Sequence, residues 1–96
     1  MMVLVTYDVE TITPKGRWRL RKVSKECLNY GQRVQNSVFE CVVSESQLIM
    51  LESKIRGIID MDVDSVRFYR LGKGYERKIK VLGKVTSYSV TEPLII

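Results

Sequence analysis

The chain has 96 residues, of which 45% are hydrophobic and 28% charged, and its formal net charge is +5. This length predicts a single domain over residues 1–96, and the composition is that of a folded globular protein with no disordered or membrane-spanning segment. The sequence contains no histidine, which excludes histidine-activated nucleophiles and the common zinc sites. Any hydrolysis must therefore use carboxylates with a hard metal ion, or Lys, Tyr and Arg side chains.

The N-terminal third predicts a strand followed by a helix. Residues 2–8 alternate along a strand that is apolar on both faces, as a central strand is. The N-terminus has neither the basic flank nor the cleavage site of a signal peptide, so we expect a cytoplasmic protein. Thr13 as the N-cap and Pro14 at the first helical position predict a helix to about Tyr30, which stops at Gly31.

The middle third predicts a hairpin and a second helix. Residues 33–43 are rich in β-forming side chains and indicate either a hairpin or one long strand bent around positions 35–36. Ser44 and Gln47 have the spacing of a capping box, which begins an amphipathic helix that ends near Asp60. The two cysteines have no metal-ligand spacing, so we expect both to be buried, reduced thiols.

The last third predicts further strands. We expect a strand at 64–71, a turn at 72–74 and an edge strand at 78–82 that lysines protect. The order strand, helix, strand, strand, helix, strand is that of a ferredoxin-like βαββαβ fold, an α+β class with both helices on one face of the sheet. The other face then needs cover, which predicts a homodimer. The apolar final triplet, residues 94–96, is predicted to pack on a partner.

Charges are segregated along the chain. Residues 15–33 contain seven basic side chains and one acid, residues 67–84 contain seven more and one acid, and residues 40–64 contain six acids and two basic side chains. Solubility alone favours interspersed signs. The segregation therefore favours a polyanionic partner such as nucleic acid over a merely solvated surface.

Two motifs in the basic C-terminal segment are weak. The turn at 72–74 lacks the following helix of a phosphate loop, and we interpret it as a basic loop whose Lys73 contacts backbone phosphates. An RNA-recognition motif would continue Lys73 and the next two residues with small and aromatic side chains, but Glu76 and Arg77 interrupt that pattern.

Asp8 ends the first predicted strand and is the candidate for chemistry. Its structural interpretation is a carboxylate that pairs with an arginine or caps the next loop. Its functional interpretation is favoured by its place at the carboxyl end of a central strand, before an arginine-rich segment, in a chain without another reactive cluster. Two such carboxylates across a dimer two-fold would hold Mg²⁺, which activates water and neutralises a scissile phosphate.

The Tyr7-Asp8 strand end, the helix with Arg19 and Arg21, and the stretch RVQNSVFE from Arg33 together resemble the CRISPR-associated protein two family. Members of this family are small dimeric partners of the CRISPR adaptation integrase, and the resemblance covers essentially the whole chain. It implies a homodimer with facing sheets, in which the last strand of each protomer joins the partner's sheet, so that residues from about 77 to 96 pack on the partner protomer. It also implies an endonuclease that uses Mg²⁺ or another divalent cation such as Mn²⁺, with Asp8 as the catalytic, metal-binding residue.

The resulting hypothesis is a CRISPR adaptation protein that hydrolyses phosphodiester bonds of DNA or RNA. The alternative is a non-catalytic scaffold that binds duplex DNA and bridges integrase dimers, and a third hypothesis is a toxin-like ribonuclease of the same fold. The candidate nucleic-acid-binding residues are Arg17, Arg19, Arg21, Arg33, Ser37, Lys73 and Arg77. Pairing of an arginine with Glu26 or Glu40 is the structural alternative. Tyr7 and Phe39 are predicted to be structural or interface residues.

Overall fold

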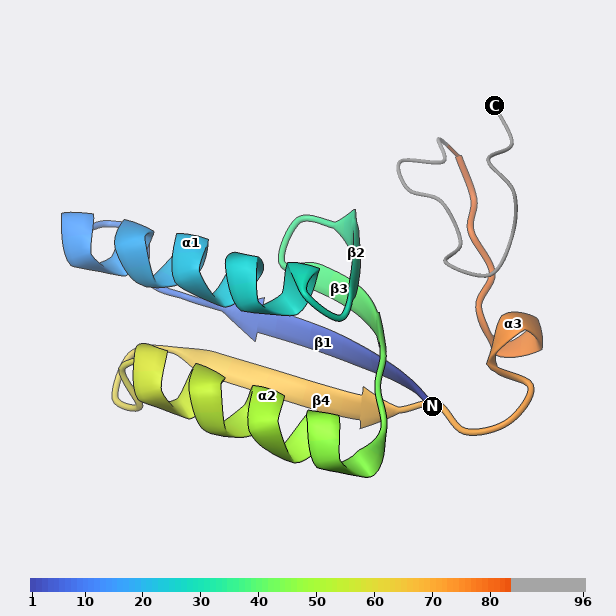
Figure 1. Cartoon of the computed structure of the whole chain (residues 1–96). Helices are drawn as coiled ribbons and strands as arrows, with labels where there is room; N and C mark the ends of the chain where they lie inside the picture. The colour runs from blue at the N-terminus through green and yellow to red at the C-terminus, as the bar shows by residue number, and fades with distance from the viewer. Residues whose placement is uncertain (84–96) are drawn as a thin grey trace.

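The computed structural model describes residues 1–83, which form a four-stranded antiparallel sheet with two long helices on one face (Figure 1). The elements, in chain order, are β1 (Met2–Asp8), α1 (Pro14–Leu28), β2 (Gly31–Gln35), β3 (Val38–Val42), α2 (Glu45–Ile58), β4 (Ser65–Arg70) and α3 (Tyr75–Lys78). The strand order β2-β3-β1-β4 places β1 inside the sheet. The α+β, ferredoxin-like prediction is confirmed. No helix in residues 1–83 is long and apolar enough to cross a membrane.

Both long helices begin at the caps that the sequence predicts. The Thr13 hydroxyl accepts a hydrogen bond from the Gly16 N–H at 3.0 Å, and Pro14 occupies the first turn of α1. The capping box of α2 is complete, because the Ser44 side chain accepts from the Gln47 N–H and the Gln47 side chain accepts from the Ser44 N–H. The helix α1 is two residues shorter than expected, since Asn29 is its C-cap.

The segment after α1 is a hairpin and not one bent strand. Strands β2 and β3 are joined by a two-residue turn at positions 36–37, in which Ser37 has a positive φ of 63°. The pairing of β2 with β3 contains an irregularity between Arg33 and Gln35. At Gly31 a side chain would collide with the backbone of Glu40, so the close approach of the two strands requires glycine there.

The core lies between the sheet and the two helices. Alternate β1 residues face it, namely Val3, Val5 and Tyr7, and they pack with Phe39 and Cys41 of β3 and with apolar residues of both helices. Cys27 and Cys41 are both free and buried. The neighbouring Cys41 side chain and burial both raise the pKa of the Cys27 thiol. The opposite face of the sheet, called the open face below, exposes Val42 and Tyr69.

The segment after β4 differs from its prediction. Residues 75–78 form the short helix α3, and residues 79–83 form no strand, so the expected edge strand at 78–82 is not formed in this chain. Gly72 and Gly74 both have φ of 73°, a conformation that turns the backbone away from the sheet, and the Lys78 ammonium donates a hydrogen bond to the Leu71 carbonyl at 3.0 Å. The predicted partner-packing tail beyond residue 83 lies outside the described residues.

Candidate active site and nucleic-acid-binding residues

Asp8 lies at the end of β1 on the open face of the sheet. Side chains alternate along a strand, so the buried Tyr7 faces the helices while the exposed Asp8 faces the other way. The register partner of Asp8 is Ser65 at the start of β4. Within residues 1–83, no hydrogen bond or ion pair involves the Asp8 carboxylate. No group in residues 1–83 therefore competes with a ligand for this carboxylate.

A partly buried network contacts the strand end from the helix side. The Tyr7 hydroxyl and the Ser24 Oγ of α1 are 2.8 Å apart, and the Arg33 Nη2 donates to the same Oγ at 3.0 Å. The Arg33 guanidinium also lies 5.4 Å from the centroid of the Phe39 ring, which stacks against Tyr7. These contacts connect β1, α1, β2 and β3 around Tyr7, the neighbour of Asp8 in β1, on the helix side of the sheet.

Ser24 is a member of this network that the sequence analysis did not identify. It lies among the buried residues of α1 near Val23 and Cys27. A hydroxyl on the apolar stripe of a helix needs a hydrogen-bond partner when it is buried. That signal predicts a polar contact for Ser24, although the sequence gives no means of choosing Tyr7 and Arg33 as the partners.

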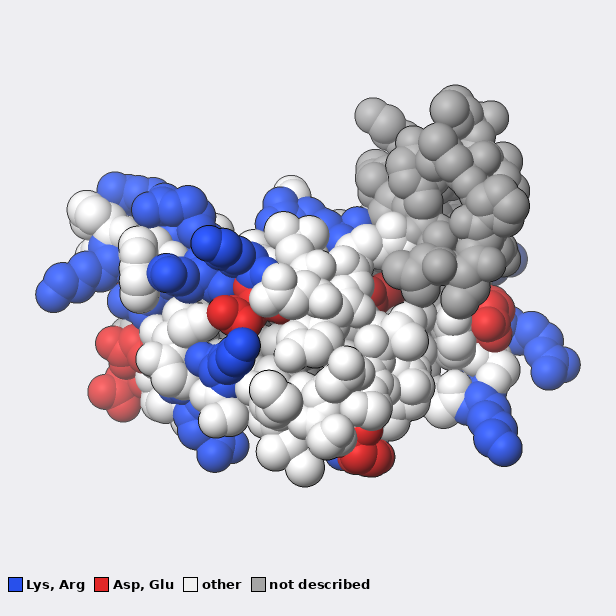
Figure 2. Space-filling model, in the orientation of Figure 1, with Lys and Arg blue, Asp and Glu red and all other residues white. Residues whose placement is uncertain are grey.

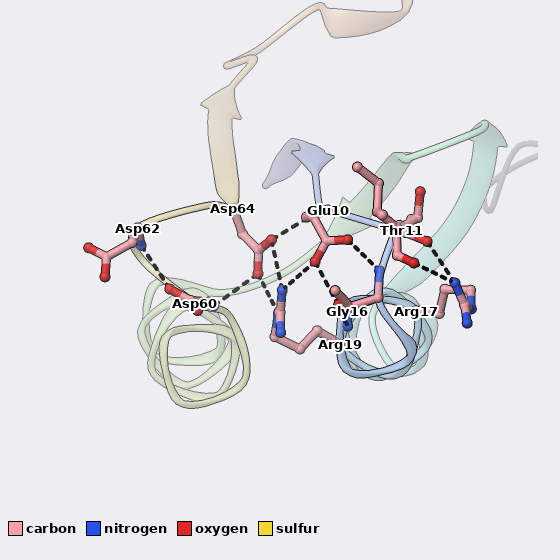
Figure 3. Close-up of polar contacts among 10 residues, drawn as sticks. Glu10, Thr11, Gly16, Arg17, Arg19, Asp60, Asp62 and Asp64 are labelled. Atoms are coloured by element: carbon pink, nitrogen blue, oxygen red, sulfur yellow. Dashed lines mark hydrogen bonds and ion pairs between the residues drawn. The ribbon is translucent and has the colours of Figure 1, made fainter.

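Three charged residues form an ionic clamp beside the end of β1: Glu10, Arg19 and Asp64 (Figure 3). The Asp64 side chain is 0% exposed, and it accepts hydrogen bonds from Arg19 Nε at 2.7 Å, from the Asp60 N–H at 2.9 Å and from the Glu10 N–H at 3.0 Å. Burial alone would raise the pKa of Asp64, but these hydrogen bonds outweigh it and lower the pKa. The clamp joins α1 and the loop after β1 to the loop before β4.

The ionic clamp engages Arg19, a residue that the sequence predicted to bind nucleic acid. The Arg19 side chain is 12% exposed, and its guanidinium binds Asp64 and reaches Glu10 at 3.4 Å. A phosphate contact by Arg19 remains a prediction, which requires this pairing to open. The partner is neither Glu26 nor Glu40, because Asp64 is brought to Arg19 from 45 positions along the chain by the packing of β4 beside β1.

The other predicted nucleic-acid-binding residues lie on α1, at the hairpin of β2 and β3, and after β4. Arg17 donates two hydrogen bonds to the carbonyls of Thr11 and Ile12, at 3.0 and 3.1 Å (Figure 3). Arg21 is exposed on α1. Ser37 is at the hairpin turn and lies near the Asp8 end, since its carbonyl accepts the Tyr7 N–H at 3.0 Å.

Lys73 and Arg77 are separated from Asp8 by the length of the sheet. They follow the last residue of β4, Arg70, which lies near Val3 at the start of β1, whereas Asp8 ends β1 (Figure 1). Both side chains are exposed. The structure therefore places Ser37, Arg33 and the ionic clamp at the same end of the sheet as Asp8, although Arg33 and Arg19 lie on the helix side and Asp8 on the opposite face. Lys73 and Arg77 lie at the other end.

Residues 1–83 contain no complete metal site. Within residues 1–83 no group of three or more Asp, Glu, His or Cys side chains lies close enough together to hold an ion. Asp8 supplies one exposed hard oxygen ligand of the kind that Mg²⁺ accepts, and Mg²⁺ keeps several of its own waters. Asp8 is thus one candidate ligand of Mg²⁺, and within residues 1–83 it does not form a complete site.

Comparisons with known proteins give one consistent result. Residues 1–79 match the family model described as CRISPR associated protein Cas2. The chain is 52% identical over 95 residues to a CRISPR-associated endonuclease Cas2 of Halalkalibacterium halodurans, with 99% of each chain covered, and 46% identical over 95 residues to a CRISPR-associated endoribonuclease Cas2 of Rhodospirillum rubrum, with 99% and 100% covered. The crystal structure of Streptococcus pyogenes Cas2 at pH 6.5 has a TM-score of 0.81 and 57% identity, covering 86% of this chain and 100% of that one.

Proposed function

The chain belongs to the CRISPR-associated protein Cas2 family, and from this premise we propose that it is a metal-dependent endonuclease of CRISPR adaptation that hydrolyses phosphodiester bonds of RNA or DNA. The names of two similar relatives, an endonuclease and an endoribonuclease, support nuclease activity. The observation that carries the proposal is the exposed Asp8 carboxylate at the end of β1, which has no partner within residues 1–83.

The proposed active form is a homodimer with facing sheets. The open sheet face carries exposed Val42 and Tyr69 and partly exposed Leu4, and a second copy would remove this apolar surface from water. Asp8 projects from the same face, so a two-fold axis near this end of the sheet would bring two Asp8 carboxylates together.

Asp8 of each chain would hold Mg²⁺ or Mn²⁺ in this dimer. When bound, such an ion activates water and neutralises charge on the scissile phosphate. Tyr7 and the Ser24 hydroxyl keep the strand end fixed from beneath, so that the two carboxylates keep their positions. Arg33 donates to Ser24 on the helix side of the sheet, so any phosphate that its remaining N–H groups bind lies on that side and not beside Asp8.

A scaffold role on duplex DNA is the second proposal. The basic side chains of α1 give this helix a strongly positive surface, visible at the end of the molecule where α1 begins (Figure 2). A positive surface binds nucleic acid whether or not the nucleic acid is then cleaved. If spacer integration survives the substitution Asp8→Ala, the scaffold role that bridges integrase dimers stands without the chemistry.

A nuclease assay with a control variant tests the proposal. Wild-type, Asp8→Ala and Asp62→Ala proteins are compared on single-stranded RNA and duplex DNA, with Mg²⁺ and with a chelator. Asp62 is also an exposed aspartate, and its side chain points away from the ionic clamp (Figure 3).

We expect the Asp8→Ala variant to lose more than about 100-fold in cleavage rate, because even outer-shell partners of a metal are worth about 10- to 100-fold. The Asp62→Ala variant should cleave like the wild type, and the chelator should stop both. Cleavage by Asp8→Ala protein at the wild-type rate with Mg²⁺ would show that the proposal is wrong.

A further inference from the structure

The outward face of α1 carries a half-exposed tryptophan. Trp18 is 48% exposed and is the one tryptophan in the chain. The buried residues of α1 are Gly16, Val23, Ser24 and Cys27. Successive residues of a helix are rotated by about 100°, so Trp18 lies nearly opposite this buried face. The core therefore does not account for the indole.

Basic side chains surround Trp18 on the helix surface. Those at helical spacing from it, all exposed, are Lys15, Arg21, Lys22 and Lys25. The Lys22 ammonium lies 5.3 Å from the centroid of the Trp18 ring, within the range of a cation–π contact. No acid in residues 1–83 forms an ion pair with any of these four, whereas Arg19 on the same helix is paired with two.

An aromatic face among cations fits one chemical class of partner best. In proteins that bind single-stranded nucleic acid, Lys and Arg hold the phosphates while exposed aromatic rings stack on the bases. A duplex keeps its base faces inside the stack, so the ring would have nothing to stack on. A membrane surface would need a free apolar helix face, but the apolar face of α1 is already buried in the core.

We propose that Trp18, with Lys15, Arg21, Lys22 and Lys25, forms a binding site for unpaired nucleotides of RNA or DNA. The site lies on the helix layer, whereas Asp8 projects from the opposite face of the sheet. It anchors an unpaired segment of the nucleic acid away from the place of cleavage. The inference rests on the proposed nucleic-acid function but not on the chemistry of Asp8.

The single tryptophan makes a direct test possible, because its fluorescence reports this site alone. Asp8→Ala protein, which keeps the nucleic acid intact under the proposed mechanism, is titrated with single-stranded RNA, single-stranded DNA and a duplex of equal length. Tryptophan emission and the anisotropy of a dye on the oligonucleotide are followed together. We expect both single strands to change the emission as they bind, and the duplex to bind without that change. Comparison of the two single strands identifies the preferred nucleic acid.

Variants separate stacking from charge and from folding. Trp18→Ala should weaken single-strand binding by about 10-fold and duplex binding by less than twofold, while Trp18→Phe should restore most of the affinity. Ile49→Ala is the control, since it removes a 65% exposed apolar side chain from α2 and should leave binding unchanged. Circular dichroism of each variant should match that of the wild type.

Four results would overturn the site, and three of them concern how binding occurs. They are an emission change that is equal for duplex and single strand, single-strand binding by anisotropy without any emission change, and equal affinities of wild-type and Trp18→Ala proteins. The absence of any oligonucleotide binding overturns it as well. If the emission change is seen but wild-type protein cleaves nothing, the proposed nuclease is wrong and this site stands. If cleavage depends on Asp8 but the emission does not change, the nuclease stands and this site is wrong.

Discussion

Asp8 and Asp64 lie at the same end of the sheet in opposite environments. Asp8 pairs in register with Ser65, the residue after Asp64. Asp64 is buried and accepts hydrogen bonds from one guanidinium and two backbone N–H groups, whereas Asp8 is exposed and has no partner within residues 1–83. A carboxylate whose lone pairs are used inside the fold stabilises that fold, while an open carboxylate can bind a cation. Local environment and not proximity thus separates a structural acid from a candidate catalytic one.

Removing the Asp64 side chain should produce the largest difference in stability between variants of the two aspartates. Asp64→Ala leaves the partly buried Arg19 guanidinium and the N–H groups of Glu10 and Asp60 without their acceptor, and should lower the free energy of unfolding by roughly 3 kcal/mol. Asp8→Ala should change it by less than about 0.5 kcal/mol, since Asp8 is exposed. Urea unfolding of both variants measures the difference. Equal losses for the two would contradict the distinction.

Two arginines of α1 extend the contrast to the basic residues. Arg19→Ala breaks the ionic clamp and leaves the buried Asp64 carboxylate without its cation, so it should lower the free energy of unfolding clearly more than Arg21→Ala does. Arg21→Ala should leave unfolding within about 0.5 kcal/mol but lower the salt dependence of oligonucleotide binding by about one counterion. Unfolding and salt titrations of the same two proteins provide the measurement. A stability loss for Arg21→Ala as large as that for Arg19→Ala would contradict the distinction between the paired Arg19 and the exposed Arg21.

The stabilisation by Asp64 should also be visible in the pH dependence of the free energy of unfolding, as a smaller change than in the substitutions above. Because folding lowers the pKa of Asp64 below its ordinary value of 3.8, its contribution is present above that pH and is lost as the pH falls through the folded-state pKa. The wild type should therefore lose more stability than Asp64→Asn between about pH 5 and pH 2. Urea midpoints across this range test the sign. A larger acid loss in Asp64→Asn would reverse it.

The sequence predicted what local interactions decide. The N-caps Thr13 and Ser44 form contacts with residues three positions away, so their pattern is visible in the sequence. The alternation along β1 also placed Asp8 and Tyr7 on opposite faces, because that alternation is a property of a single strand.

Tertiary contacts explain what could not be predicted. The choice of Asp64 as the partner of Arg19 depends on β4 packing beside β1, and no spacing rule spans those 45 positions. The alternation of Ile79 and Val81 with lysines suggested a strand, but the left-handed turn at Gly72 and Gly74 leads the chain away from the sheet. A period-two pattern becomes a strand only where a neighbouring strand is present to pair with it.

Metal binding by the intact protein tests whether Asp8 is half of a shared site. Isothermal titration with Mg²⁺, and with Mn²⁺ for confirmation, is carried out on wild-type, Asp8→Ala and Asp62→Ala proteins. We predict one ion for every two chains in the wild type and in Asp62→Ala, and no binding in Asp8→Ala. One ion for each chain, or binding that Asp8→Ala leaves unchanged, would contradict the shared site.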